Sequence, residues 1–138
     1  MLVDANGIPL SVFVDAANVS EVAMGYVVVQ LTLALLPPMA KQPIPVLGDK
    51  AYDCDWLRNE LWKSGLVLVS KHRSNRVKEK TSDGRRERRL KRRWKIERSN
   101  AWLHSYRRAL TRYEKSINRY EGFVSLACAF MALGKLIK

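Results

Sequence analysis

The chain opens with two short apolar runs, Leu2–Asp4 and Ile8–Val14, that flank a turn signal at Asn6-Gly7. Asn-Gly favours a hairpin turn because both residues tolerate positive φ. We therefore predict that the chain begins with a β-hairpin inside a sheet. A longer apolar segment follows, and its polar start near Ser20 predicts a helix over residues 20–36 that ends at Pro37-Pro38.

The next pattern is a strand, a helix and a second strand within residues 46–70. Val46–Asp49 is a short apolar strand, and Asp53 or Asp55 is placed to cap a helix with apolar residues at helical spacing. Gly65 ends this helix, and Leu66–Val69 is the second strand. Because the natural geometry of such a unit is a parallel right-handed crossover, the pattern predicts an α/β sheet.

The second half of the chain is predicted to be basic and mainly helical. Polar turn signals predict a basic loop over residues 71–84, followed by a basic helix over residues 85–110. A last helix is expected over residues 116–134, because apolar residues recur there at helical spacing: Phe123, Leu126, Ala127, Phe130 and Leu133. With 138 residues, the chain is long enough for one domain and too short for two.

Charge narrows the classes of partner. The chain has 25 Lys and Arg residues against 13 Asp and Glu residues, a formal net charge of +12, which favours a polyanionic partner such as nucleic acid.

The apolar stretches Val22–Leu36 and Phe123–Ile137 are shorter than the roughly 18 residues that span a bilayer, so we interpret them as buried elements. Cys54 and Cys128 lack metal-finger spacing, and no secretory signal opens the chain. A reducing cytoplasm is therefore predicted.

Two carboxylates are candidates for chemistry. On the predicted basic helix, Arg93, Glu97, Asn100 and His104 form a polar row between two apolar rows, so we expect this row to face the protein. A buried Glu97 would need a cation or metal ion, and the alternative is an i,i+4 ion pair with Arg93. Asp49 follows the first parallel strand, where α/β sheets place ligands, although it could instead cap a turn. Together the two acids suit a divalent-metal site for phosphoryl transfer.

Three segments resemble the DDE transposases of bacterial insertion sequences, and the resemblance covers nearly the whole chain. Val46–Asp53 is similar to the family segment that carries the second catalytic Asp, which corresponds to Asp49. Trp94–Arg98 and the basic residues after it are similar to the segment that carries the catalytic Glu, which corresponds to Glu97. Leu2–Leu10 resembles the preceding hairpin. The resemblance implies a ribonuclease H-like α/β domain lacking its first strand, with a β-hairpin, a helix, the βαβ unit and two C-terminal helices.

The resemblance also implies an activity and the residues for it. Asp49 and Glu97 would be catalytic and would bind two Mg²⁺ ions, or Mn²⁺, with a further Asp. The reaction implied is DNA cleavage at the ends of an element and strand transfer to target DNA. Partners would be DNA and other transposase subunits, as a homo-oligomer or with full-length relatives, in the bacterial cytoplasm at the nucleoid. The DNA contacts implied are Lys50, Arg93, Arg98, His104, Arg107, Arg108 and Arg112.

The sequence departs from the family at three places. Leu90 stands where part of the family has Tyr, and His104 where it has Lys. The family's first catalytic Asp would precede Met1, and Asp4 and Asp15 are the upstream acids that could replace it. We therefore interpret the chain as a truncated catalytic domain, inactive alone. The alternatives are a non-catalytic DNA-binding protein that regulates a full-length transposase, and an RNA-binding basic protein in which the two acids have no role.

Overall fold

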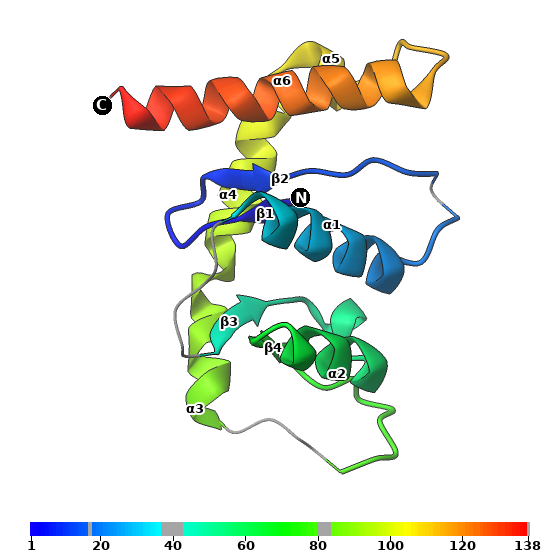
Figure 1. Cartoon of the computed structure of the whole chain (residues 1–138), viewed down its shortest axis with the longest axis vertical. Coiled ribbons are helices and arrows are strands. Elements are labelled where there is room, and N and C mark those ends of the chain that lie inside the picture. The colour runs from blue at the N-terminus through cyan, green and yellow to red at the C-terminus, as the bar shows by residue number, and fades with distance from the viewer. Residues whose placement is uncertain (17, 37–42, 80–83, 138) are drawn as a thin grey trace.

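In the computed structural model, small layers of strands and helices lie along one long helical segment (Figure 1). The structure describes residues 1–16, 18–36, 43–79 and 84–137. The elements, with η for a 3₁₀ helix, are β1 (Leu2–Val3), β2 (Pro9–Ser11), α1 (Glu21–Leu35), β3 (Ile44–Leu47), η1 (Lys50–Tyr52), α2 (Asp55–Lys63), β4 (Leu66–Val69), α3 (Gly84–Glu87), η2 (Arg88–Arg93), α4 (Trp94–Leu103), α5 (Arg107–Leu110) and α6 (Ile117–Leu136).

The N-terminal hairpin is confirmed. β1 and β2 pair antiparallel, and Gly7 lies in the turn with φ of +83°, a backbone conformation that favours glycine. The Asp4 carboxylate accepts hydrogen bonds of 2.8 Å from the amides of Asn6 and Ile8, which closes the turn. The Ser99 hydroxyl of α4 donates to the Gly7 carbonyl at 2.6 Å, so the turn is attached to the long helical segment.

The strand–helix–strand unit is also confirmed, with one difference at its helix. β3 and β4 pair parallel, with Ile44 beside Leu66 and Leu47 beside Val69. The prediction that Asp53 or Asp55 caps α2 was wrong, because the capping position is Cys54 and no side chain caps the helix there. Asp55 is the first helical residue, and the Asp53 carboxylate is taken up by other partners described below.

Among the described residues, the hairpin and the parallel strand pair do not join into one sheet. The described residues form two separate two-stranded sheets, β1–β2 and β3–β4. In Figure 1, the β1–β2 hairpin and α1 lie in the middle of the molecule, and β3, β4 and α2 lie below them. The described residues therefore belong to the α/β class, but their strands form two separate sheets and not one continuous sheet.

Helix α1 follows the prediction for residues 20–36, and Pro37-Pro38 lie outside the described residues. The basic helix expected over residues 85–110 was wrong in its continuity. The chain is helical from Gly84 to Leu103, through a 3₁₀ stretch at Arg88–Arg93, and then breaks before α5. Tyr106 is extended, with φ of −84° and ψ of 107°. The break lets Ala109 bury itself against α6, where the Tyr120 hydroxyl donates to the Ala109 carbonyl at 2.7 Å.

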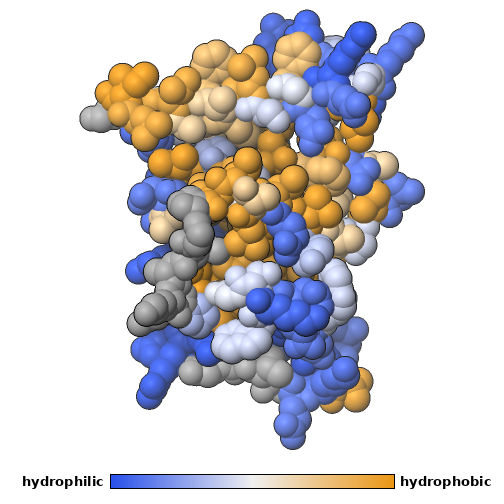
Figure 2. Space-filling model, in the orientation of Figure 1, coloured by the Kyte–Doolittle hydropathy of each residue, from blue (hydrophilic) through white to orange (hydrophobic). Residues whose placement is uncertain are grey.

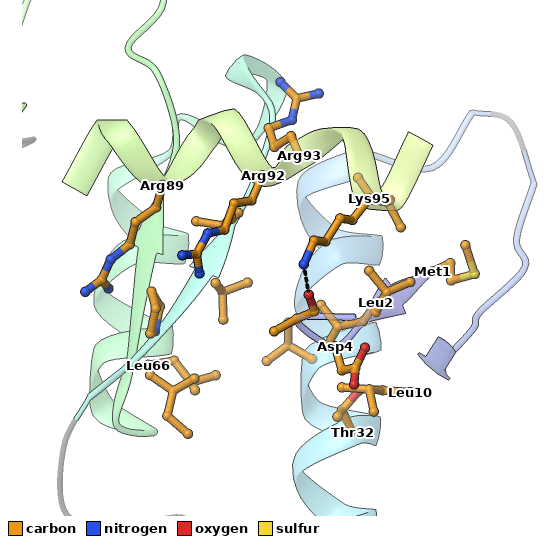
Figure 3. A pocket seen from close by; sticks show the side chains of 18 of the residues that line it. Met1, Leu2, Asp4, Leu10, Thr32, Leu66, Arg89, Arg92, Arg93 and Lys95 are labelled. Carbon is orange, nitrogen blue, oxygen red and sulfur yellow. Dashed lines mark hydrogen bonds between the residues drawn. The ribbon is translucent and has the colours of Figure 1, made fainter. Parts of the chain in front are cut away.

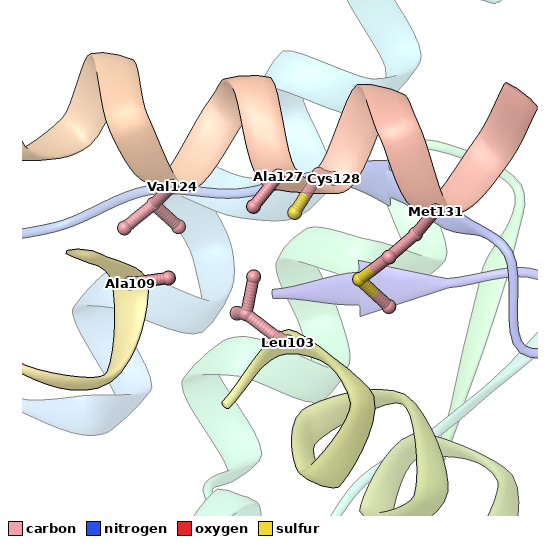
Figure 4. Packing of buried hydrophobic residues seen from close by; sticks show 6 residues of the cluster. All are labelled: Leu103, Ala109, Val124, Ala127, Cys128 and Met131. Atoms are coloured by element: carbon pink, nitrogen blue, oxygen red, sulfur yellow. The ribbon is translucent and has the colours of Figure 1, made fainter. Parts of the chain in front are cut away.

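The last helix, α6, is confirmed, but the interpretation of Phe123–Ile137 as a buried element holds for one side of the helix only. Leu126, Phe130 and Leu133 are each about half exposed, at 52%, 53% and 49%. The buried side of α6 packs on α4 and α5 in the cluster of Figure 4, formed by Leu103, Ala109, Val124, Ala127, Cys128 and Met131. α6 is apolar on more than one side, so its spacing alone did not identify the packed side. Among the described residues, no helix has the length and apolar character needed to cross a membrane.

Candidate active site

Asp49 lies at the position that the sequence predicted, directly after β3 and at the start of η1. Its Oδ1 atom accepts from the Lys50 amide at 2.5 Å, so it caps the 3₁₀ turn. Its side chain nevertheless remains 55% exposed. The turn-cap interpretation is thus correct, and it leaves the carboxylate accessible to a further partner.

Glu97 lies on α4 and shares a cation with Asp49. Arg93 Nη1 is 3.3 Å from Asp49 Oδ1, and Arg93 Nη2 is 3.8 Å from Glu97 Oε1. One guanidinium therefore brings together two acids that are 48 positions apart in the sequence. The i,i+4 ion pair of Arg93 with Glu97 is present, and Asp49 joins it.

The polar row on the basic helix faces solvent, which corrects the expectation that it would face the protein. The Glu97 side chain is 67% exposed, and Asn100 and His104 are exposed as well. The side of α4 that packs inward is formed by Ser99 and Leu103. The row was misassigned because Trp94 and Ala101, which made it look bracketed by apolar residues, are themselves exposed.

The predicted DNA-contacting residues fall into two groups. Lys50 and Arg93 lie at the two acids, and Arg98 stacks on Trp94 at 4.9 Å and donates to the Asn6 carbonyl at 2.9 Å. The second group lies after α4, at the exposed residues His104, Arg107, Arg108 and Arg112. Within it, Arg108 forms an ion pair of 2.7 Å with Glu114, and Arg112 donates to the Glu114 and Lys115 carbonyls.

Comparison with known proteins assigns the chain to a family. The family described as the transposase DDE domain matches residues 1–132. The chain belongs to this family. It is also 29% identical, over 99% of its length, to a protein of Burkholderia cepacia described as a putative transposase for insertion sequence element IS402. The chain spans 62% of the length of that relative. No solved structure matches the chain.

Asp49 and Glu97 are acids of the kind that could supply two ligands of a metal site. Carboxylate oxygens are hard ligands of the kind that Mg²⁺ prefers, and Asp49 and Glu97 already converge on one cationic group. Within the part of the chain that the structure describes, no group of three or more His, Cys, Asp or Glu residues could hold a metal ion. The Asp4 carboxylate is engaged in the hairpin turn, and Asp15 bonds its neighbouring amide at Ala16. Neither side chain is brought to the pair.

Another carboxylate near the site, Asp53, was predicted only as a possible helix cap, and its cluster of cations was not predicted. Its side chain is 1% exposed, and its Oδ1 atom lies 3.0 Å from Arg58, 2.9 Å from His72 and 3.3 Å from Arg76. The Arg73 amide donates to Oδ2 at 2.8 Å. Burial would raise the pKa of Asp53, but the hydrogen bonds from Arg73, Arg58 and His72 outweigh burial and lower the pKa from 3.8 to about 2.

The Asp53 cluster holds the turn that carries Asp49. The Arg73 guanidinium donates to the Lys50 carbonyl at 3.2 Å and to the Ala51 carbonyl at 2.7 Å, and both carbonyls belong to η1. Segment 71–79 was predicted as a basic loop, and it contains no helix or strand. Its arginines fix it to η1 and α2. The concentration of cations in segment 71–79 was the sequence signal that could have indicated this attachment to η1 and α2.

Proposed function

We propose that the chain is a catalytic domain of a DNA transposase of an insertion sequence. The observation that carries the proposal is the convergence of Asp49 and Glu97 on Arg93, together with membership of the DDE domain family. DNA cleavage and strand transfer are the reactions proposed. DNA is the proposed substrate, in agreement with the net charge of +12.

Asp49 and Glu97 are the proposed ligands for divalent ions, Mg²⁺ or Mn²⁺. Two such ions, when bound, would activate the attacking oxygen and stabilise the leaving oxygen of a phosphodiester. The chain's own residues do the positioning. Asp49 is fixed by its bond to the Lys50 amide, whereas the ion pair that holds Glu97 to Arg93 is long. Arg93 neutralises both acids in the metal-free protein and is placed to bind a phosphate oxygen instead.

The proposed site also needs a third carboxylate, which none of the described residues of this chain supplies. The fold proposed is accordingly ribonuclease H-like without its first strand. The chain by itself should bind DNA without cleaving it, and it should act in the bacterial cytoplasm as a homo-oligomer or with full-length transposase subunits. The further DNA contacts proposed are Lys50, Arg98, His104, Arg107, Arg108 and Arg112.

Manganese binding tests the assignment of the two acids. Titration of the chain with Mn²⁺ in the presence of a short duplex, followed by electron paramagnetic resonance, should show bound ions beyond those that the duplex binds alone, and these should be lost in Asp49→Asn and in Glu97→Gln. Asp15→Asn is the matched control, because Asp15 is an exposed acid away from the pair. Binding that survives both substitutions would refute the assignment.

A plasmid-nicking assay tests the reaction. The 138-residue chain should leave supercoiled DNA intact with Mg²⁺ or Mn²⁺. A version extended in frame by the codons upstream of Met1 should nick it, and Asp49→Asn or Glu97→Gln in that version should remove the activity. Nicking by the unextended chain that depends on Glu97 would overturn the need for an outside acid.

A non-catalytic DNA-binding regulator is the second candidate. The observation in its favour is that Arg93 already neutralises both acids, so the basic surface needs no metal ion. This candidate predicts that the extended version does not nick DNA and that Asp49→Asn and Glu97→Gln leave Mn²⁺ binding unchanged. The two experiments above therefore separate the candidates.

A further inference from the structure

The side chain of Tyr52 packs against two glycines, Gly25 and Gly48, which we call the glycine seat. A Cβ atom at Gly25 of α1 would lie 2.5 Å from the Tyr52 ring, and a Cβ atom at Gly48, after β3, would lie 3.2 Å from Tyr52 Cβ. Glycine inside a helix is less favourable than alanine, so its place within α1 indicates a packing constraint. The helix and the ring approach each other this closely only because residue 25 has no side chain.

The backbone links Tyr52 to Asp49. Asp49 precedes η1, Tyr52 is the last residue of η1, and the Tyr52 amide donates to the Asp49 carbonyl at 3.0 Å. The Arg73 guanidinium holds the same turn to segment 71–79 through the Lys50 and Ala51 carbonyls, whereas the Tyr52 ring holds it to α1. Because the turn is this short, a shift of the Tyr52 ring would move the whole turn and redirect the Asp49 carboxylate.

A groove separates α1 from the strand pair β3–β4. Its volume is about 970 Å³, and residues of α1 and β3 line it. Figure 3 shows the groove between Leu66 of β4 and Thr32 of α1, with Arg93 pointing away from it. Tyr52 lies outside the groove and packs with the buried cluster that joins α1 to α2. Contacts in this cluster, and not contacts across the groove, therefore set how η1 stands relative to α1.

Further contacts connect α1 to the helix that carries Glu97. Ser11 Oγ of the hairpin lies 2.5 Å from the Thr32 hydroxyl of α1, and the hairpin turn accepts hydrogen bonds from two side chains of α4. Figure 2, in the orientation of Figure 1, shows apolar side chains gathered at the level of the hairpin and α1. Glu97 and Asp49 are therefore connected through the hairpin and α1, and Tyr52 is the last contact of this path.

We propose that Tyr52 is a positioning residue whose ring, held by the glycine seat, sets the direction of the Asp49 carboxylate and its distance from Glu97. The inference rests on the proposed function, in which the two acids act at one site. The bond from the Lys50 amide fixes the Asp49 carboxylate to the turn, so the carboxylate follows the turn. The ion pair of Asp49 with Arg93 is partly exposed and too weak to hold the turn by itself.

The ring of Tyr52, and not its hydroxyl, fills the glycine seat. The Tyr52 atoms that a Cβ at either glycine would meet are carbon atoms. Burial raises the pKa of Tyr52, and the nearby carboxylates of Glu21 and Asp49 raise this pKa further, so the phenol is neutral at pH 7. Tyr52→Phe therefore removes no charge and keeps the seat filled, whereas Tyr52→Leu leaves part of the seat empty.

Manganese binding measures the position of Asp49. The chain is titrated with Mn²⁺ beside a short duplex, and electron paramagnetic resonance counts the ions beyond those that the duplex binds alone. Gly25→Ala and Tyr52→Leu should each weaken this binding about tenfold or more, because both displace the support behind a metal ligand. Tyr52→Phe, the conservative variant, should restore wild-type binding. Gly122→Ala is the matched control, because a Cβ at this glycine of α6 would meet no other described residue within 4 Å.

Two further measurements separate the ring from a general loss of structure. Hydrogen exchange at the Tyr52 amide, which donates to the Asp49 carbonyl, should be faster in Gly25→Ala and Tyr52→Leu than in the wild type, with or without Mn²⁺. Adding Gly25→Ala to Tyr52→Leu should change neither exchange nor Mn²⁺ affinity further, because the clash requires the ring. Circular dichroism checks that each variant is folded, and the comparison of Tyr52→Leu with Tyr52→Phe decides the matter if Gly25→Ala does not fold.

Three results would overturn the inference while leaving the proposed function in place. The first is equal exchange at the Tyr52 amide and equal Mn²⁺ affinity in Gly25→Ala and Gly122→Ala. The second is a loss of Mn²⁺ binding in Tyr52→Phe as large as in Tyr52→Leu, which would assign the effect to the hydroxyl. The third is faster exchange with unchanged Mn²⁺ affinity, which would give the seat a purely structural role. Mn²⁺ binding that survives Asp49→Asn would refute the proposed function, and the inference with it.

Discussion

Removal of the Asp53 charge should strongly destabilise the half of the molecule that carries Asp49. Asp53 is 1% exposed and faces Arg58, His72 and Arg76, which are 15%, 5% and 11% exposed. Breaking a buried pair by removing one partner costs about 3–5 kcal/mol, because the remaining charges are buried without compensation. Asp53→Ala should therefore lower the free energy of unfolding by about 3–5 kcal/mol.

The pH dependence gives a second magnitude from the same group. The pKa of Asp53 is lowered from 3.8 to about 2 in the folded protein. A depressed pKa contributes stability that is present above the unfolded value and is lost as pH falls through the folded value, and this shift corresponds to about 2 kcal/mol. The contribution should be complete at pH 7, decline below about pH 5 and be gone below pH 2. Asp53→Asn should remove this decline.

Urea unfolding followed by circular dichroism at pH 7, 4 and 2 measures both effects. Asp15→Asn is the control, because Asp15 is exposed and bonds only its neighbouring amide among the described residues. It should change stability by less than about 0.5 kcal/mol. If Asp53→Asn has wild-type stability at pH 7 and the wild-type pH profile, the carboxylate does not hold the cluster together and the reasoning is refuted.

Three further outcomes follow from other contacts. Arg93→Ala should change the free energy of unfolding by no more than about 1 kcal/mol, measured in urea, because its two ion pairs are partly exposed. The slope of log K for duplex DNA against log salt should be steep, and changing Lys50 and Arg107 to Ala together should reduce it by about 2, because each is a proposed phosphate contact. Gly7→Ala should destabilise the folded protein by about 1–3 kcal/mol in thermal unfolding, more than Gly65→Ala does. Both glycines have positive φ, but of the two only Gly7 would bring a Cβ close to another atom, Ser99 Oγ at 2.9 Å.

Local signals were sufficient for the elements whose residues are close in sequence. The Asn6-Gly7 turn was predictable because turn chemistry acts over a few residues. The unit ending at Val69 was predictable because the order strand, helix, strand has one common geometry, a parallel right-handed crossover. The break after Leu103 and the packed side of α6 were not, because both depend on Ala109 burying itself against a helix that comes later in the chain. A helix that is apolar on several sides gives no information about which side packs.

In the candidate site, too, local features were predictable from the sequence and contacts between distant residues were not. Asp49 was predictable from its place after a strand, whereas Asp53 finds partners 19 to 23 positions away, beyond any local pattern. The exposure of Glu97 was mispredicted because apolar neighbours on the helix, such as Trp94, suggested burial although Trp94 is itself 50% exposed. Composition gave the charge of segment 71–79 but not the carboxylate around which it folds.

The two carboxylates that follow β3 carry opposite kinds of ion pair, and this contrast suits their different roles. Asp53 is buried among cations, so its partners cannot be exchanged for solvent without a large loss of stability. Asp49 is 55% exposed and shares Arg93 with an even more exposed Glu97, so each of those pairs contributes about 1 kcal/mol or less. Because a weak, solvated pair is readily replaced by a stronger cation, the Asp49 carboxylate can change partner while the Asp53 cluster keeps its turn in place.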